Sequence, residues 1–392
     1  MQQDNDIVIL GGGCAGLSLA MRLAELGEPG PQAVVLESRA RYVQDRTWCF
    51  WDDGTARLSH LVRHRWPAVT VGAGPRRVTV DCRSTPYQMI PADVFYAAAA
   101  GAIAKTPRIE LAMNETIIAE PRKEGLRWRI ETSAGVRSAK WIIDTRPGPR
   151  PERGAAILWQ SFSGWEIECD ADRFDPGSAT LMEFSFGRAA EIAFLYLLPF
   201  SSRCALIEVT VFAPEPLGPS ELAASLESLV HRQVRGAGYA VLRSEHGVLP
   251  MGQAAPAPNP DVTYVRAGAA AGGVRAASGF AFQRIQSWAE DCAAALAAGR
   301  PPLAHPSDPW PLRSMDRLFL RVLRAEPEGA PTLFLKLFSM KNPGRVVRFM
   351  SDRATLTDCV AIILALPARP FLREIVHGFM ANSLAPTRSR VG

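Results

Sequence analysis

The stretch that decides the fold runs from Asp6 to Glu37 and reads DIVILGGGCAGLSLAMRLAELGEPGPQAVVLE. Residues 6–10 are apolar and rich in β-branched side chains, which predicts a strand. Residues 17–26 have apolar side chains at helical spacing and end at a glycine, which predicts a helix. Residues 33–36 predict a second strand, with an acid directly after it. Strand, glycine turn, helix, strand and acid in this order predict a βαβ unit that binds a dinucleotide.

Each glycine of the turn has a definite task in such a unit. Gly11 permits the tight turn, Gly13 lets the backbone approach a pyrophosphate, and Gly16 lets the helix pack closely on the strand. The N-terminus of the helix supplies partial positive charge for the phosphates. Glu37 is placed to accept hydrogen bonds from ribose hydroxyls, which favours FAD or NAD over NADP. A glycine-rich turn without a ligand is the alternative.

Length and composition exclude several classes of protein. The chain has 392 residues, 47% hydrophobic and 21% charged, which excludes disordered and fibrous proteins and allows two cores. Its seven cysteines and six histidines form no CxxC, metal-ligand or nucleophile pattern, which predicts a reduced, cytoplasmic protein without a metal site. Every window of 18 residues contains charges or helix breakers, so we expect membrane contact, if present, at the surface.

The excess positive charge lies in the last fifth of the chain. Residues 311–392 contain 13 Lys and Arg against 6 Asp and Glu, whereas residues 1–310 contain 31 against 33. Arg313, Arg317, Arg321 and Arg324 share one face of a predicted helix. Such a face suits anionic lipid headgroups, with the apolar stretch 333–338 expected to add a hydrophobic contact, and an ordinary solvated helix face is the alternative. Nucleic acid is disfavoured, because no binding motif accompanies the charge.

The rest of the chain divides into further predicted elements. Residues 157–215 contain four strand-like runs with short turns, which predict an antiparallel sheet. Other strands are expected within 78–90, 109–113, 126–131 and 136–143, with helices at 92–104 and 219–236. Residues 263–273 repeat the theme of strand and glycine turn before a helix, and the Pro-rich patches at 146–151 and 254–260 are expected to connect two domains.

Several stretches in chain order carry a family likeness. They are DRTWCFW at 45–51, YQMIPADVF at 87–95, IDTR at 143–146, QSFSGWE at 160–166, LMEF at 181–184, FLYLLP at 194–199, LIEVT at 206–210, EHGVLPM at 245–251, GGVRAASGFAFQRI at 272–285 and RFM at 348–350. With them, nearly the whole chain resembles the bacterial lycopene cyclase family. The resemblance implies an α/β flavoprotein fold of the aromatic hydroxylase and geranylgeranyl reductase type. It has a Rossmann-like FAD-binding domain, an inserted antiparallel-sheet substrate domain and a helical C-terminal region.

Domain boundaries follow from this expected fold. The FAD-binding domain is expected at 1–80, 106–155 and 256–310. The substrate domain is expected at 81–105 and 156–255, and a helical, membrane-facing region at 311–392.

The resemblance also implies a reaction and a catalytic acid. The reaction is proton-initiated cyclisation of the ψ-ends of lycopene to β-ionone rings, without net oxidation, on an enzyme whose FAD is kept reduced by NAD(P)H. Such chemistry needs one acid, aromatic faces and exclusion of water. Glu208 is the catalytic acid that the LIEVT stretch implies, and the polar face of an edge strand is its alternative role. The family has a second acid beside it, whereas this chain has Val209.

Two further sets of residues follow from the family motifs. The residues expected at the cofactor are Gly11, Gly13, Cys14, Ala15, Gly16, Glu37, Arg46, Asp144, Gly268, Gly272 and Gly273. The residues expected in the substrate pocket are Trp48, Trp51, Phe162, Trp165, Phe184, Tyr196 and Phe280. Related flavoproteins have Gly-Asp where this chain has Gly268-Ala269, so flavin affinity must depend more on the later glycines. Asp45 and Arg46 are expected either to pair with each other or to contact flavin or substrate.

Two other classes of function stay open at this point. A flavin monooxygenase or prenyl reductase would share the glycine motif, and a non-catalytic carotenoid-binding protein would keep the aromatic pocket. The expected partners are lycopene, other acyclic or monocyclic carotenes and an anionic membrane surface, without nucleic acid or an obligatory protein partner. The expected location is the cytoplasm, peripherally on the inner face of the cell membrane.

Overall fold

The computed structural model describes residues 2–27, 30–52, 54–55, 57–148, 154–184, 186, 191–253 and 259–383. The strands in these residues are β1 (Gln2–Leu10), β2 (Ala33–Glu37), β3 (Thr47–Trp51), β4 (His64–Trp66), β5 (Ala68–Ala73), β6 (Arg76–Asp81), β7 (Tyr87–Pro91), β8 (Ile109–Met113), β9 (Arg122–Glu124), β10 (Arg127–Thr132), β11 (Gly135–Asp144), β12 (Leu158–Cys169), β13 (Ser178–Glu183), β14 (Ile192–Pro199), β15 (Cys204–Ala213), β16 (Tyr239–Met251) and β17 (Tyr264–Arg266). The α-helices are α1 (Cys14–Glu25), α2 (Ala92–Ala104), α3 (Pro219–Val234), α4 (Phe282–Ala297), α5 (Trp310–Ala325), α6 (Ala330–Phe338), α7 (Gly344–Met350), α8 (Leu356–Ala365) and α9 (Ala368–Ser383).

The first sheet carries the predicted βαβ unit. Its order is β8-β2-β1-β11-β10-β9, with β17 also paired to β11. Strand β1 pairs in parallel with both β2 and β11, and β17 pairs in parallel with β11. Alternate residues of β1 face opposite sides, so Ile7 and Ile9 pack in the cluster with α1, α2 and α4, while Val8 and Leu10 pack with Trp128. The sheet is therefore covered on both faces.

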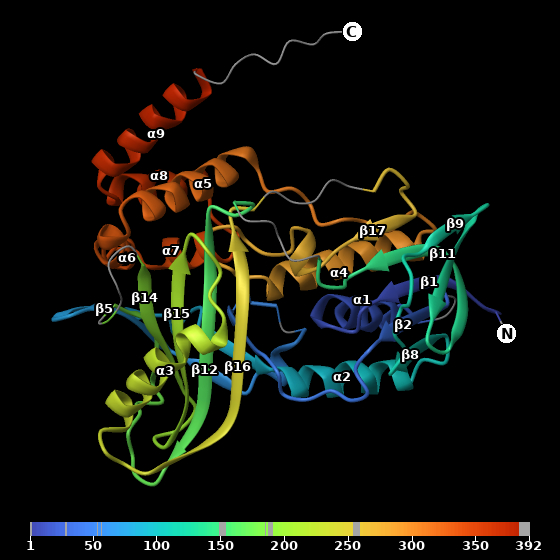
Figure 1. Cartoon of the computed structure of the whole chain (residues 1–392), viewed down its shortest axis with the longest axis horizontal. Coiled ribbons are helices and arrows are strands. Elements are labelled where there is room, and N and C mark those ends of the chain that lie inside the picture. The colour runs from blue at the N-terminus through green and yellow to red at the C-terminus, as the bar shows by residue number, and fades with distance from the viewer. Residues whose placement is uncertain are drawn as a thin grey trace.

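The second sheet lies beside the first and also has seven strands (Figure 1). Its order is β16-β12-β15-β14-β13-β5-β6, antiparallel except where β13 pairs with β5. One face of β12, β14 and β15 packs on α3 through buried residues such as Leu226 and Val209. The opposite face looks toward the C-terminal helices. A small sheet, β3-β7-β4, adjoins both.

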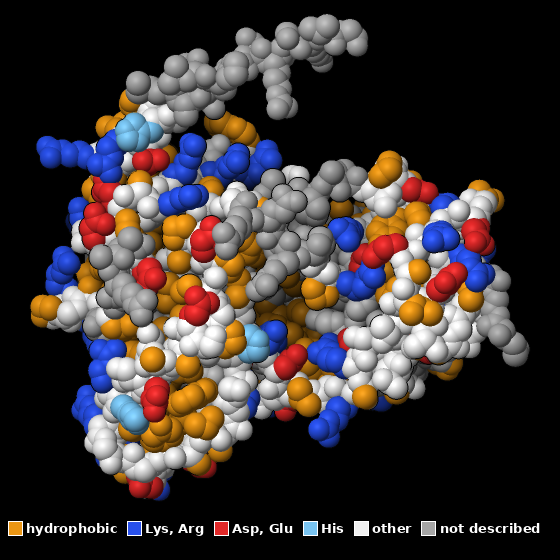
Figure 2. Space-filling view, viewed as in Figure 1, with side chains coloured by type: hydrophobic (Ala, Val, Ile, Leu, Met, Phe, Trp, Pro, Cys, Tyr) orange, Lys and Arg blue, Asp and Glu red, His pale blue; other side chains and the backbone are white. Residues whose placement is uncertain are grey.

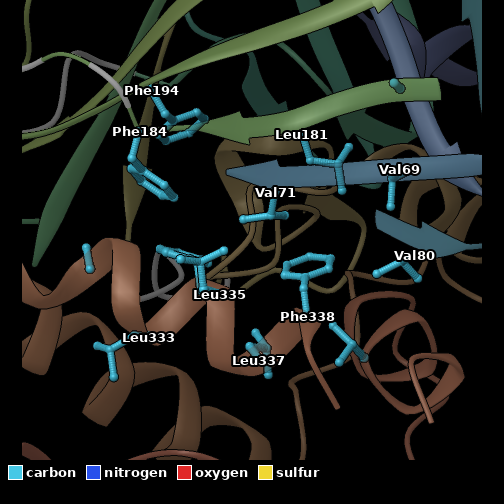
Figure 3. Close-up of a cluster of buried hydrophobic side chains, with 14 of the residues drawn as sticks. Val69, Val71, Val80, Leu181, Phe184, Phe194, Leu333, Leu335, Leu337 and Phe338 are labelled. Atoms are coloured by element: carbon cyan, nitrogen blue, oxygen red, sulfur yellow. The ribbon is translucent and has the colours of Figure 1, made fainter. Parts of the chain in front are cut away.

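The C-terminal helices close the free face of the second sheet. Figure 3 shows the contact, in which Leu335, Leu337 and Phe338 of α6 lie against Val71 of β5 and Leu181 of β13. Each of these five side chains is less than 9% exposed. Apolar residues at helical spacing in α6 thus serve the core, and the stretch 333–338 does not form an exposed surface.

The predicted fold class is confirmed, with differences at the element boundaries. Residues 78–90 form two strands, β6 and β7, separated by a turn, and the second glycine turn is followed by a loop before α4 begins at Phe282. Strands β5 and β6 belong to the second sheet, so residues 68–80 lie with the expected substrate domain although they were expected in the FAD-binding domain. Parts of both Pro-rich patches, residues 149–151 and 254–258, lie outside the described residues.

Candidate functional site

A row of residues across the second sheet places two carboxylates on one face. Tyr196 of β14 is opposite Glu208 of β15, Glu208 is opposite Gly164 of β12, and Gly164 is opposite Glu245 of β16. Gly164 has no side chain, and a Cβ there would lie 3.2 Å from the Cβ of Glu208. The strand between the two glutamates therefore has no side chain at this position in the row. The backbones of the two glutamates are about 10 Å apart, which is two strand spacings.

Glu208 is a buried acid with an apolar environment. Its side chain is 7% exposed, and Thr210 donates a hydrogen bond of 2.6 Å from Oγ1 to its Oε1. Burial, followed by repulsion from Glu245, raises the pKa of Glu208 to about 8, although Thr210 and Arg243 act in the opposite direction. Glu208 therefore holds a proton at neutral pH. A carboxylic acid in this state can donate that proton to a bound molecule.

Glu245 has the opposite kind of environment. It accepts a hydrogen bond of 2.8 Å from Thr47 Oγ1 and pairs with Arg243 at 2.6 Å. Arg243 also pairs with Glu166 at 2.6 Å and donates to Thr47. Charge-assisted hydrogen bonds of this kind are short and strong. The two carboxyl groups on this wall therefore have different partners, a hydroxyl for Glu208 and a guanidinium with a hydroxyl for Glu245.

Both glutamates line a cavity of about 570 Å³ between the second sheet and the C-terminal helices. Strand β15 contributes alternate residues, Glu208, Thr210 and Phe212, because successive strand residues face opposite sides of the sheet. Most of the lining is apolar and aromatic, as in sites for small apolar ligands. The lining aromatic residues are Tyr87, Phe162, Phe194, Tyr196, Phe212, Phe280, Phe319, Phe334, Phe338, Phe349 and Phe371.

The structure brings three of the seven expected pocket residues to this cavity, namely Phe162, Tyr196 and Phe280. Trp165 faces α3 instead, since it is one residue out of phase with Phe162 on β12. Phe184 stacks on Phe334 within the core, at a centroid distance of 5.7 Å, and is absent from the lining.

The two tryptophans of the DRTWCFW stretch also lie outside the cavity lining. Trp48 stacks on Phe282 and meets Phe95 edge-on, so it joins the core of the first domain. Trp51 is 1% exposed and packs against Tyr87. The polar residues of that stretch reach the cavity instead, through Arg46 and Thr47.

The cavity reaches the surface of the molecule at α8 and α9. Ile363, Leu372 and Ile375 all line the cavity, and they are 56%, 58% and 39% exposed. Neighbouring Leu364 is 79% exposed. Exposed apolar side chains in one place are uncommon on monomeric proteins and mark interaction surfaces. Figure 2 shows Lys and Arg side chains gathered over the adjacent α5, whose Arg313, Arg317, Arg321 and Arg324 are exposed.

The GxGxxG turn has the geometry expected of a phosphate site. Gly11 has φ 96°, and a Cβ at Gly16 would lie 2.0 Å from the Gly11 carbonyl oxygen, so α1 packs directly on the turn. No described atom lies within 4 Å of the place where a Gly13 Cβ would stand. Within the described chain, no side chain caps the N-terminus of α1 and no acid lies in its first turn. Burial raises the pKa of Cys14 to about 12, so this thiol carries no negative charge either.

Glu37 lies beside this turn. Its carboxylate accepts from the backbone N–H of Gly12 at 3.0 Å, from the backbone N–H of Arg39 at 2.8 Å and from the Arg39 guanidinium at 2.9 Å. Although burial opposes ionisation, these hydrogen bonds hold the pKa of Glu37 below its usual value. A carboxylate has about four acceptor positions, and the fourth is contacted only by the Ser38 hydroxyl at 3.5 Å, so a ribose hydroxyl can take its place.

The second glycine segment meets the first. A Cβ at Gly268, where φ is 87°, would lie 3.1 Å from the Cβ of Ala15 on α1. Gly268 donates its N–H to His305 Nε2 at 3.0 Å, and burial, followed by the charge of Arg284, lowers the pKa of His305 to about 4, so the imidazole is a neutral acceptor. Gly273 donates back to the Gly268 carbonyl at 3.0 Å. Gly272, with φ 92°, completes this turn.

Asp144 and Arg46 take different positions. Asp144, at the end of β11, is ion-paired with Arg146 at 2.9 Å and accepts from the Tyr264 hydroxyl at 2.7 Å. Arg46 lines the cavity and donates to the Asp45 carbonyl at 2.7 Å. The Asp45 carboxylate pairs with Arg39 rather than with Arg46.

These residues fit a dinucleotide cofactor. The open Gly13 backbone, the uncapped helix N-terminus and the remaining acceptor position of Glu37 match a pyrophosphate and a ribose. The loop that follows Gly273 reaches the cavity at Phe280. A cofactor held on the first sheet would thus have its far end near the cavity.

Four residues of the site were not expected from sequence. Glu245 lies within the EHGVLPM stretch, and Arg243 two residues before it shares its strand face, but only the sheet register places them beside Glu208. Arg39 follows Glu37 by two residues and was detectable as a basic partner for the acid. No sequence pattern pointed to His305, because its partner Gly268 is distant in sequence.

Comparison with known proteins gives the family. The profile described as Lycopene cyclase protein matches residues 6–376. The chain belongs to the lycopene cyclase family. A search of curated protein sequences returned no significant match.

Solved structures similar to the chain show its fold. A geranylgeranyl bacteriochlorophyll reductase-like protein from Thermoplasma acidophilum has a TM-score of 0.62 at 13% identity, over 96% of this chain and 99% of that protein. The p-nitrophenol 4-monooxygenase PnpA from Pseudomonas putida DLL-E4 has a TM-score of 0.60 at 17% identity, over 97% and 98%. The flavin-dependent monooxygenase PieE, solved with FAD and substrate, has a TM-score of 0.61 at 10% identity, over 92% and 71%. This lycopene cyclase family member therefore has the fold of aromatic hydroxylases and geranylgeranyl reductase-like proteins.

Proposed function

We propose that the protein is a lycopene β-cyclase, which converts the ψ-end groups of lycopene to β-ionone rings by proton-initiated cyclisation. The observation that carries this proposal is Glu208, a protonated acid on the wall of a cavity lined by aromatic residues. Family membership supports the substrate class. The substrate and its product are isomers, so no hydride or oxygen atom enters the product.

The cavity residues have defined tasks in this reaction. Glu208 donates its proton to the terminal alkene, which leaves a tertiary cation. The next isolated double bond of the end group attacks this cation through its far carbon and closes a six-membered ring. Aromatic faces such as those of Phe162, Phe194 and Tyr196 stabilise positive charge and exclude water. Loss of a ring proton then gives the neutral product, so one proton enters and another leaves.

The cofactor in this proposal is FAD, with NAD(P)H as its reductant. The residues that would hold it are Gly11, Gly13, Gly16 and Glu37 on the first sheet and the Gly268–Gly273 turn. When bound in its reduced form, FAD supplies an electron-rich ring system near the cavity. Flavin monooxygenases and reductases share this fold, but an acid that is protonated in an apolar cavity favours cyclisation over oxygen or hydride transfer.

The proposed location is the surface of a membrane. A carotene is wholly apolar and must come from a bilayer, and the cavity opens at the exposed apolar residues of α8 and α9. The expected contribution of the apolar stretch 333–338 is not retained, because all of its residues except Lys336 are buried in the core. The α5 arginines remain in place to attract an anionic leaflet, each for about 1 kcal/mol. Among the described helices, none has the length and apolar character needed to cross a bilayer.

Expression in cells that accumulate lycopene tests the proposal. We expect the pigment to change from lycopene to its monocyclic and bicyclic isomers, detected by absorption spectrum and retention time. Unchanged lycopene in the presence of soluble, flavin-containing protein would overturn the proposal.

A further inference from the structure

Glu245 occupies a special place relative to the proposed acid. It lies in the same row of the sheet as Glu208, on the same face, with only Gly164 between them. Its side chain is 6% exposed and faces the cavity. The neighbouring position on β15, Val209, is fully buried toward α3, so strand alternation prevents it from placing an acid in the cavity. The second carboxylate of the cavity therefore comes from β16.

Two hydrogen bonds hold Glu245, and an ion pair holds one of their donors. Arg243 is two residues away on the same strand face, and Thr47 reaches it from β3, where both donate to Oε2. Arg243 is itself held by Glu166, its direct neighbour across the strands. A carboxylate anchored in this way cannot turn away from Glu208.

We propose that Glu245 is a positioning residue, a fixed negative charge that keeps the proton on Glu208. This inference rests on the proposed function for its use in catalysis, but the electrostatic effect exists without substrate. Two like charges in a poorly hydrated cavity are unfavourable, so the ionised Glu245 opposes ionisation of Glu208. The cation formed after proton transfer would also lie between two carboxylates.

The other groups that face Glu208 do not carry the same effect. Burial raises the pKa of Cys49 to about 12 and those of Tyr87 and Tyr196 well above their usual value, so all three are neutral. Arg243 acts in the opposite direction but is shared with Glu166 and Glu245.

The remaining charges on the cavity wall are Arg46, from the DRTWCFW stretch, and the buried pair of Arg275 and Asp316, which neutralise each other at 3.1 Å.

Infrared titration of the Glu208 carboxyl tests the inference. The protonated C=O band is assigned by its loss in Glu208→Gln, and its midpoint is followed from neutral to alkaline pH in protein without substrate. In Glu245→Gln we expect the midpoint to fall by about one pH unit or more. Glu245→Asp, which keeps the charge, restores most of the shift. Glu166→Gln is the matched control, because it removes the other carboxylate partner of Arg243 and leaves Glu245 in place.

A second variant covers the case in which Glu245→Gln does not fold. Thr47→Val has the same shape and removes one hydrogen bond to Glu245, so the midpoint falls in the same direction by a smaller amount. An unchanged midpoint in the folded variants, or an equal fall in Glu166→Gln, would overturn the inference. Failure of the proposed function can be told apart from failure of this inference. In that case the titration would give the expected shift, but Glu208→Gln would retain full activity.

Discussion

At the scale of single residues, the account depends on the different environments of two glutamates. Glu208 is surrounded by apolar groups and one hydroxyl, whereas Glu245 is paired with a guanidinium. The two side chains are chemically identical, so the raised pKa of Glu208 comes from the fold around it.

Removing the acid tests its role in catalysis. Glu208→Gln has nearly the same shape but cannot donate a proton, so we expect turnover to fall about 100-fold or more. FAD content should persist, because the glycine turns lie on the first sheet. Glu208→Asp should retain more activity than the glutamine variant. Pigment formation by flavin-replete protein is the measurement, and activity within a few-fold of the parent would show that another group supplies the proton.

The same variant should alter the pH dependence of stability. The pKa of Glu208 is about 8 in the folded protein against an ordinary value of 4.5. As pH rises from 4.5 toward 8, the unfolded chain releases this proton while the folded protein keeps it, so the parent loses stability relative to Glu208→Gln. The loss should be on the order of 1 kcal/mol per pH unit within that window. Thermal unfolding at several pH values measures it, and a difference between the two proteins that does not change with pH contradicts the raised pKa.

At the scale of elements, sequence patterns predicted some features well and others poorly. The βαβ unit from Asp6 to Glu37 was predictable because every determinant is local, in turn glycines and apolar spacing. The membership of β5 and β6 in the second sheet was not, because β5 pairs with β13 more than a hundred residues later. The LIEVT motif singled out Glu208, which lines the cavity, and its catalytic role stays a prediction. Trp165 was placed in the wrong environment because the motif does not say which face of β12 it occupies.

The contact between α1 and its turn gives a prediction at this scale. In Gly16→Ala the new Cβ would lie 2.0 Å from a backbone oxygen, so α1 must shift. We expect a loss of about 3 kcal/mol of stability and weaker FAD binding. Gly101→Ala in α2 is the control, because no described atom lies within 4 Å of its Cβ and alanine favours a helix by about 0.5–1 kcal/mol. Denaturant unfolding and flavin content measure both, and normal flavin binding by Gly16→Ala would argue against this phosphate site.

At the scale of the whole molecule, the cavity joins three parts of the chain. The second sheet forms one wall, the C-terminal helices cover it, and Arg46 and Thr47 line it from the segment that follows β2 in sequence. Among the described residues, none from the first sheet lines the cavity. The cofactor and the substrate are therefore expected to meet only where the 275–280 loop and Arg46 reach the cavity.

The opening at α8 and α9 predicts which residues contact a bilayer. Replacing Leu364 and Leu372 together with asparagine should weaken binding to anionic vesicles at least about tenfold, because each apolar side chain contributes about 1.5–3 kcal/mol when fully buried. Leu126→Asn is the matched control, since this leucine is 89% exposed and lies between β9 and β10. Replacing the four α5 arginines with glutamine should weaken binding most at low salt. Vesicle cosedimentation measures all three, and equal effects of the helix and control variants would reject this surface.

The most direct test of the central claim is the product formed from lycopene by the purified protein under anaerobic conditions, with chemically reduced FAD in one sample and oxidised FAD in the other. The account predicts cyclised products of the same mass as lycopene, formed with reduced FAD and not with oxidised FAD. A product that has gained hydrogen or oxygen would contradict the assigned reaction, and equal cyclisation in the two samples would contradict the requirement for the reduced cofactor.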